Sequence, residues 1–139
     1  MAQEDSAIKT SGVVFDTDIL IWYFRGNQKA GSFLDNVPHS KRTISSLTMM
    51  ELIQGCRHKQ EIQLLKNFIR ENIAKILYPN EFCCLRAVRL IEQHSLSHGL
   101  RVVDSLIASS ALEEDYSLAS GNLKHYNIIA GLKLISFKP

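Results

Sequence analysis

The chain has 139 residues, 45% of them hydrophobic and 22% charged, with a formal net charge of +2. This size and composition predict one globular domain that needs neither disulfides nor a structural metal for stability. The small net charge does not demand an anionic partner, so any nucleic-acid function must rest on a local site. No apolar run reaches the ~20 residues that cross a bilayer, and the polar N-terminus is no signal peptide, so we expect a cytoplasmic protein without membrane association.

The first predicted element is a buried strand at residues 12–16, which follows a flexible leader at residues 1–11. Its apolar residues run directly into Asp16. A carboxylate in that position lies where open α/β sheets bind their ligands, outside the carboxyl ends of the strands. Residues 12–139 form the single predicted domain.

A short helix is predicted next, at residues 18–25. Thr17 and Asp18 can cap its start, and Gly26 follows its end. The helix is apolar nearly all round, which indicates either deep burial or a place in a subunit interface.

The remaining predicted elements alternate between helices and strands. The helices are expected at residues 28–36, 47–57, 60–72, 81–94 and 102–114, and the strands at residues 43–45, 75–78, 116–119 and 132–137. Ser46 can cap the helix at 47–57. In the helix at 81–94, apolar residues recur at helical spacing, namely Phe82, Leu85, Val88 and Ile91. Such alternation indicates an α/β fold with parallel strands joined by right-handed crossovers.

Asp104 stands in an apolar stripe of its predicted helix. Its neighbours at helical spacing are Ile107, Ala108 and Ala111. A carboxylate among apolar side chains is costly unless it is paired. An aspartate in the first turn also interacts favourably with the helix dipole, so a structural role and a metal-binding role both remain open for Asp104.

Glu51 shares a helix face with Thr48 and Gln54, which taken alone is typical of a solvated surface. Its helix directly follows the second predicted strand, however, and should begin near the crevice that Asp16 borders.

The stretch at residues 120–126 is interpreted as a polar loop. Ser120 and Asn122 could act there as neutral ligands, and Lys124 and His125 could contact phosphate. A surface loop without function would have the same composition.

Carboxylates on three βα units indicate a hard cation, Mg²⁺ or Mn²⁺. The histidines and the three cysteines are not at zinc-ligand spacing. A carboxylate-held Mg²⁺ suits a phosphate ester as substrate. The sequence contains no serine–histidine–acid arrangement and no P-loop.

Four segments in order resemble the motifs of PIN-domain nucleases. The first is an apolar strand ending in Asp-Thr-Asp, the second has one glutamate on a helix, the third reads Asp-Ser-Leu-Ile-Ala, and the last is similar to the C-terminal block of VapC-type toxins. They lie at residues 13–21, 45–55, 103–108, and 118–126 with 131–134. The resemblance covers essentially the whole chain after residue 11.

The resemblance implies a PIN-like three-layer α/β/α sandwich with a central five-stranded parallel sheet. It implies a Mg²⁺- or Mn²⁺-dependent endoribonuclease that hydrolyses RNA phosphodiester bonds with a metal-activated water. Such a protein is the toxin of a type II toxin–antitoxin pair. Its expected partners are RNA, a cognate antitoxin in a hetero-oligomer, and a second copy in a homodimer, which the apolar helix at 18–25 also suggests.

Carried over position by position, the resemblance makes Asp16, Glu51 and Asp104 the catalytic, metal-binding acids. Ser120 becomes the small hydroxyl residue beside the metal. The family often has a fourth acid in the last block, where this chain has no carboxylate, so Asn122 is expected to act as a neutral ligand or through water. The number of metals therefore stays open.

Four basic residues are the expected phosphate contacts, and they would position RNA without reading its sequence. They are Arg25, Arg57, Lys124 and His125. Asp18 is expected to orient the site or to serve as an auxiliary acid.

Two alternatives remain. Asp16-Thr17-Asp18 also reads as the D-x-D nucleophile motif of haloacid-dehalogenase-type phosphatases, although Ile19-Leu20 stands where that family expects Gly-Thr. The missing fourth acid also allows a catalytically weak PIN-like module that binds RNA or a partner without cutting.

Overall fold

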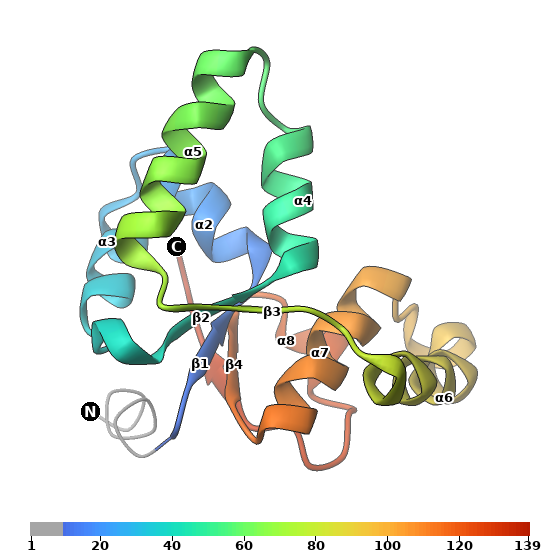
Figure 1. Ribbon diagram of the computed structural model, residues 1–139. Coiled ribbons are helices and arrows are strands. Elements are labelled where there is room, and N and C mark those ends of the chain that lie inside the picture. Colours follow the sequence, from blue (N-terminus) through green and yellow to red (C-terminus); the bar gives the residue numbers. More distant parts are fainter. Residues whose placement is uncertain (1–9) are drawn as a thin grey trace.

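The computed structural model describes residues 10–139, so the predicted leader lies almost wholly outside the described residues. The described chain forms five strands, seven α-helices and a short 3-10 helix at His39–Lys41 (Figure 1). The strands are β1 (Val13–Phe15), β2 (Arg42–Ser45), β3 (Lys75–Leu77), β4 (Ser117–Ser120) and β5 (Leu134–Ser136). The helices are α2 (Thr17–Phe24), α3 (Gln28–Asp35), α4 (Ser46–Gln54), α5 (Lys59–Asn72), α6 (Glu81–His98), α7 (Val102–Glu114) and α8 (Leu123–Tyr126).

The five strands form one parallel sheet in the order β3-β2-β1-β4-β5, which confirms the predicted fold class. Strand β1 is central and pairs with both β2 and β4. The chain builds the sheet outward in one direction through β2 and β3, and in the other through β4 and β5. Such a reversal opens a crevice at the carboxyl ends of the two central strands.

Alternating side chains of β1 divide the core into two halves, because successive residues of a strand face opposite sides of a sheet. Val13 and Phe15 pack with the helices α2 to α5, whereas Val14 packs with α6, α7 and α8. Figure 1 shows these two groups of helices on opposite sides of the sheet. The three-layer α/β/α arrangement is thus confirmed.

Several predicted element ends were wrong. Helix α6 continues to His98 rather than residue 94, because Gly99 is the first residue to leave the helix, with a left-handed φ of 66°. The expected loop at 120–126 contains the short helix α8. Arg57 lies beyond the end of α4, in the turn before α5.

Two helix caps also differ from the prediction. Asp16, not Thr17 or Asp18, caps α2, and its side chain accepts a hydrogen bond from the Thr17 N–H. Ser45, not Ser46, caps α4 and accepts from the Leu47 N–H. Asp16 directly follows β1 and Ser45 is the last residue of β2, and both have the extended backbone geometry of an N-cap. Asp16 therefore ends a strand, begins a helix and carries a candidate catalytic carboxylate at once.

The apolar stripe that predicted α6 is not the buried face of this helix. Its buried residues are Cys83, Ala87 and Leu90, whereas the spaced apolar residues Phe82, Leu85 and Val88 point outward. Helix α2, by contrast, buries Ile19 and Leu20 completely.

Within residues 10–139, every helix is too short or too polar to cross a membrane.

Candidate active site

Asp16 lies at the carboxyl end of β1, where its backbone N–H donates to the Ala119 carbonyl of β4 at 2.8 Å. Both carboxylate oxygens are held. Oδ1 accepts from the Thr17 N–H at 2.9 Å, and Oδ2 accepts from the Ser120 hydroxyl at 2.7 Å. Asp16 and Ser120 are both buried. The parallel pairing of β1 with β4 thus places these two predicted residues together.

The environment of Asp16 disfavours its charged form. Burial is the main cause, and it raises the pKa of Asp16 to about 6. The negative charges of Asp18 and Asp104 act in the same direction, whereas the hydrogen bonds from Ser120 and Thr17 oppose the shift. An acid whose pKa is raised by burial and by neighbouring charges is typical of functional sites.

Asp18 faces the same crevice from the first turn of α2. Its Oδ2 accepts from the Gly121 N–H at 2.9 Å, and a Cβ at Gly121 would lie 2.7 Å from that oxygen, so glycine permits the approach. Its Oδ1 is buried and has no hydrogen-bond partner among the described residues. Burial raises the pKa of Asp18 too.

Asp104 lies in the first turn of α7 and is contacted by two consecutive residues of α8. The Tyr126 hydroxyl donates to its Oδ1 at 3.2 Å, and His125 Nδ1 lies 3.3 Å from its Oδ2. The sequence reasoning missed Tyr126, which is completely buried. The signal that could have pointed to Tyr126 is that a buried tyrosine hydroxyl normally needs a polar partner.

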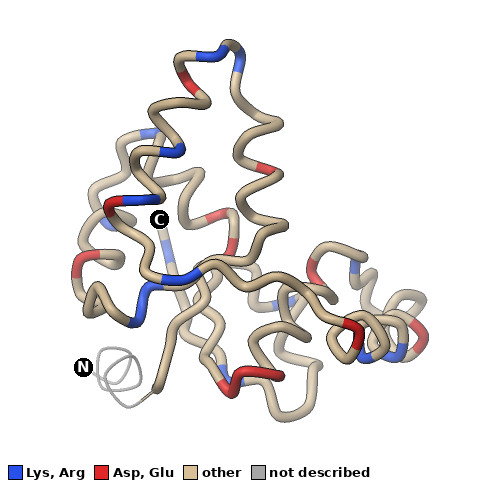
Figure 2. Tube along the Cα trace, in the orientation of Figure 1, with Lys and Arg blue, Asp and Glu red and all other residues tan. Residues whose placement is uncertain are grey.

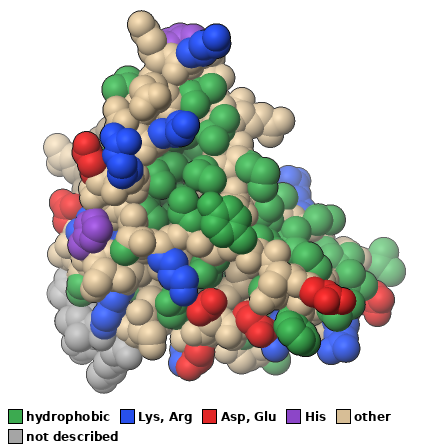
Figure 3. Space-filling view, in the orientation of Figure 1, with side chains coloured by type: hydrophobic (Ala, Val, Ile, Leu, Met, Phe, Trp, Pro, Cys, Tyr) green, Lys and Arg blue, Asp and Glu red, His purple; other side chains and the backbone are tan. Residues whose placement is uncertain are grey.

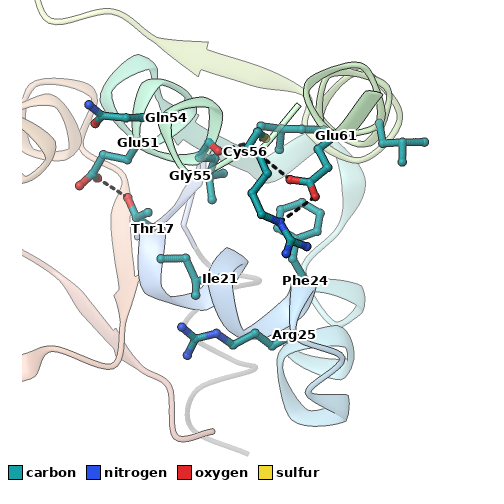
Figure 4. Close-up of a pocket in the computed structure, with 13 residues that line it drawn as sticks. Thr17, Ile21, Phe24, Arg25, Glu51, Gln54, Gly55, Cys56 and Glu61 are labelled. Carbon is teal, nitrogen blue, oxygen red and sulfur yellow. Dashed lines mark hydrogen bonds and ion pairs between the residues drawn. The ribbon is translucent and has the colours of Figure 1, made fainter. Parts of the chain in front are cut away.

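Glu51 reaches the site through a threonine. The Thr17 hydroxyl lies 2.7 Å from Glu51 Oε1 (Figure 4). It also lies 3.0 Å from the hydroxyl of the buried Thr48. Glu51 itself is exposed, on the α4 side of the crevice. Thr48 and Glu51 lie on the shared helix face that was predicted, and both contact the Thr17 hydroxyl. The sequence did not reveal these contacts.

These groups fit a divalent cation in chemistry. The donors are carboxylates and hydroxyls, the oxygen ligands that Mg²⁺ and Mn²⁺ prefer. The partnerless Asp18 Oδ1 and the raised pKa of Asp16 both indicate negative charge that a cation would stabilise. Within residues 10–139, no three acidic, histidine or cysteine side chains stand close enough to form a complete ligand set by themselves.

A groove of about 890 Å³ adjoins Thr17 and Glu51, between α2 and the α4–α5 pair (Figure 4). Arg25 and Arg57 line it together with apolar side chains. Arg25 stacks on the Trp22 ring at 5.6 Å, and Arg57 pairs with Glu61 at 3.2 Å. Charges of both signs are otherwise interspersed along the chain (Figure 2).

The structure therefore brings together most of the predicted site. Asp16, Asp104 and Ser120 meet at the crevice, with Glu51 linked through Thr17. The Asn122 side chain is exposed, and its backbone N–H donates to the Ser120 hydroxyl at 2.9 Å. Two basic residues, Lys124 and His125, lie on α8 beside Asp104, whereas Arg25 and Arg57 lie apart, along the groove.

Fold and site together define a parallel α/β protein with clustered carboxylates at the switch point of its sheet. A sequence profile of the PIN domain matches residues 13–129, and the chain belongs to this family. The match overturns the phosphatase alternative. Comparison with curated proteins gives no significant match.

Solved structures share the fold over nearly the whole chain. One is a toxin–antitoxin complex from Klebsiella pneumoniae, with 26% identity and a TM-score of 0.72, covering 87% of this chain and 95% of that one. Another is VapBC-1 from nontypeable Haemophilus influenzae, with 24% identity and a TM-score of 0.74, covering 89% and 96%.

Proposed function

We propose that residues 12–139 form a divalent-cation-dependent endoribonuclease, the toxin of a type II toxin–antitoxin pair acting in the cytoplasm. One observation carries the nuclease part: the buried Asp16, with its raised pKa, sits beside Asp18 and Asp104 at the crevice of a PIN fold. The likeness to a solved toxin–antitoxin complex supports the toxin part and a cognate antitoxin as partner.

Asp16, Glu51 and Asp104 would hold Mg²⁺ or Mn²⁺. When bound, the cation would lower the pKa of a water and offset the charge of the phosphoryl oxygens. Ser120 keeps Asp16 oriented by its hydrogen bond, and the Asn122 N–H in turn orients the Ser120 hydroxyl. The chain thus fixes its central acid from the β4 side before any ligand arrives.

Basic side chains on two sides of the acids would contact the RNA backbone. Lys124 and His125 come from α8, and Arg25 and Arg57 from the groove. To contact RNA, Arg57 would have to break or share its ion pair with Glu61. Its contribution to RNA binding should therefore be the smallest of the four.

The proposal is tested by cleavage of structured RNA with Mg²⁺ and with EDTA. We expect cleavage that requires the cation and falls at least 100-fold in Asp16→Asn and Asp104→Asn, because each removes a charge from the site. Asp115→Asn is the matched control, since Asp115 is exposed at the far end of α7. Full activity of either site variant would contradict the proposal.

The second candidate is a PIN-like module that binds RNA or a partner without cutting. It is favoured by one observation: the block from Ser120 to Tyr126 has no carboxylate. Cation-independent RNA binding without cleavage by the wild-type protein would select this alternative.

We further propose a homodimer, formed through α6 rather than α2. The outward face of α6 carries exposed apolar residues, including Phe82 at 69%, Leu85 at 52% and Leu96 at 100% exposure. Figure 3 shows hydrophobic side chains between charged ones where α6 lies. On that face Arg89 and Glu92 are exposed and make no ion pair with the described residues.

An antiparallel pairing of two α6 helices satisfies these groups. When Leu85 of one copy lies opposite Leu96 of the other, the same register places Arg89 opposite Glu92 twice. Apolar contacts and two ion pairs then form in a single two-fold arrangement. Charge complementarity therefore favours a second copy as the occupant of this face.

A further inference from the structure

Tyr126 is a buried tyrosine whose hydroxyl lies between two acids. Its ring belongs to the core cluster under α6 and α7, and the side chain is completely buried. The hydroxyl donates to Asp104 Oδ1 at 3.2 Å, and the charge of Asp16 also acts on it, raising its pKa. A core tyrosine could be replaced by phenylalanine at little cost if its hydroxyl had no role, so this placement needs an explanation.

Tyr126 and its neighbour fix both oxygens of Asp104. The hydroxyl holds Oδ1, while His125 Nδ1 lies 3.3 Å from Oδ2. Because α8 begins only three residues after β4, the strand that carries Ser120 also positions this pair. One short segment therefore orients Asp16 and Asp104 together.

The hydroxyl remains a donor at any physiological pH. Burial raises the pKa of Tyr126, and the charges of Asp16 and Asp104 raise it further. A neutral O–H that points its positive end at two carboxylates reduces their mutual repulsion.

We propose that Tyr126 is a positioning residue of the acidic site. Its hydroxyl holds the Asp104 carboxylate beside Asp16 in the orientation that a divalent cation requires. The role rests on the proposed function, since it presupposes that the acids bind a cation. Hydrogen-bond partners that orient metal ligands commonly change metal affinity by about 10–100-fold when they are removed.

The test is Mn²⁺ binding to the full chain, measured by isothermal titration calorimetry for wild type and Tyr126→Phe. The substitution keeps the buried ring and removes only the hydroxyl. We expect Mn²⁺ affinity to fall by about 10-fold or more. Two controls should bind as wild type does: Tyr78→Phe, which removes an exposed hydroxyl, and Ile129→Val, which loosens the same core cluster away from the acids.

The outcomes are distinguishable. Equal Mn²⁺ affinity of Tyr126→Phe and wild type overturns the positioning role and leaves the proposed function intact. A wild-type protein that binds no Mn²⁺ overturns the proposed function and the role with it. An equal loss in Ile129→Val assigns the effect to core packing and also overturns the role.

Discussion

The buried carboxylate of Asp16 lowers the stability of the fold at neutral pH. Its charged form is buried beside two other acids, and hydrogen bonds from Ser120 and Thr17 only partly compensate. A folded-state pKa of about 6, against 3.8 for an unperturbed aspartate, means that the folded protein holds a proton that the unfolded chain releases. The contribution of protonated Asp16 to the stability of the fold is therefore fully present below pH 3.8, and it is lost as the pH rises through about 6.

Replacing Asp16 with asparagine should stabilise the protein at neutral pH. A shift of this size corresponds to roughly 3 kcal/mol, so Asp16→Asn should gain about 1–3 kcal/mol at pH 7 without added cation. Urea unfolding from pH 4 to pH 7.5 measures the effect. The difference between variant and wild type should grow between pH 4 and pH 6 and then level off. A difference that is constant across this range would show that Asp16 does not titrate in it.

A glycine beside β1 provides a second test at the residue scale. A Cβ at Gly12 would lie 2.6 Å from the Tyr116 ring, whereas a Cβ at Gly55 would meet only ordinary contacts from 3.5 Å. We expect Gly12→Ala to cost about 1–3 kcal/mol by overpacking. Gly55→Ala, at a helical φ of −78°, should instead be neutral or stabilise by about 0.4–1 kcal/mol. Chemical denaturation compares the two, and equal effects would contradict the packing argument.

The sequence indicated the acids but not the groups that hold them. Asp16 and Asp104 stood out because carboxylates follow or interrupt apolar runs, and the motif resemblance placed Glu51 and Ser120 with them. The contacts of Thr17 and Tyr126 join residues that are 34 and 22 positions apart. No local periodicity encodes such contacts, since they depend on how the helices pack on the sheet.

Helix α6 shows the same limit at the scale of an element. The spacing of Phe82, Leu85 and Val88 correctly predicted a helix, but it did not indicate which face of that helix is buried. Small residues, Cys83 and Ala87, are the buried ones, and α7 is the main packing partner of α6. The periodicity of apolar residues indicates that a helix has an apolar face. Side-chain volume and the neighbouring element decide which face is buried.

The α6 pairing predicts a charge-reversal experiment. Arg89→Glu and Glu92→Arg should each weaken self-association at least 10-fold, because each places like charges opposite one another across the two-fold axis. The double variant Arg89→Glu/Glu92→Arg restores both ion pairs and should recover the dimer. Sedimentation equilibrium measures the three association constants.

Arg86→Glu is the control, since Arg86 pairs at 4.0 Å with Glu113 of its own chain. Failure of the double variant to recover association would rule out the proposed register. A wild-type protein that is monomeric at high concentration would rule out the interface.

At the scale of the whole molecule, the site depends on four separate parts of the chain. Asp16 and Asp18 follow β1, Glu51 lies on α4, and Asp104 lies on α7. The supporting groups lie at the end of β4 and on α8. The alternation of helices and strands predicted the parallel sheet that gathers them, and the motifs predicted their order. Element ends were less predictable, because caps and short helices such as α8 depend on individual hydrogen bonds.

Cation binding should therefore stabilise the entire fold. At a concentration 100-fold above the dissociation constant, a cation that binds only the folded state adds about 2.7 kcal/mol. The increase in Tm with Mg²⁺ should be larger at pH 7.5 than at pH 5, because Asp16 is mostly protonated below about pH 6. Calorimetry with Mg²⁺ and with EDTA measures the increase, and Asp16→Asn should reduce it at pH 7.5. Equal increases in Tm at both pH values would show that cation binding does not depend on the ionisation of Asp16.

The hydrogen bond between Ser120 and Asp16 joins positions 104 residues apart. During synthesis, Asp16 leaves the ribosome long before β4 and α8 exist, and a parallel sheet cannot complete its central pairing until β4 arrives. Interrupted translation products that stop before β4 consequently lack the groups that hold Asp16 and Asp104. Translation therefore includes an interval in which Asp16 has been made but the groups that hold it have not.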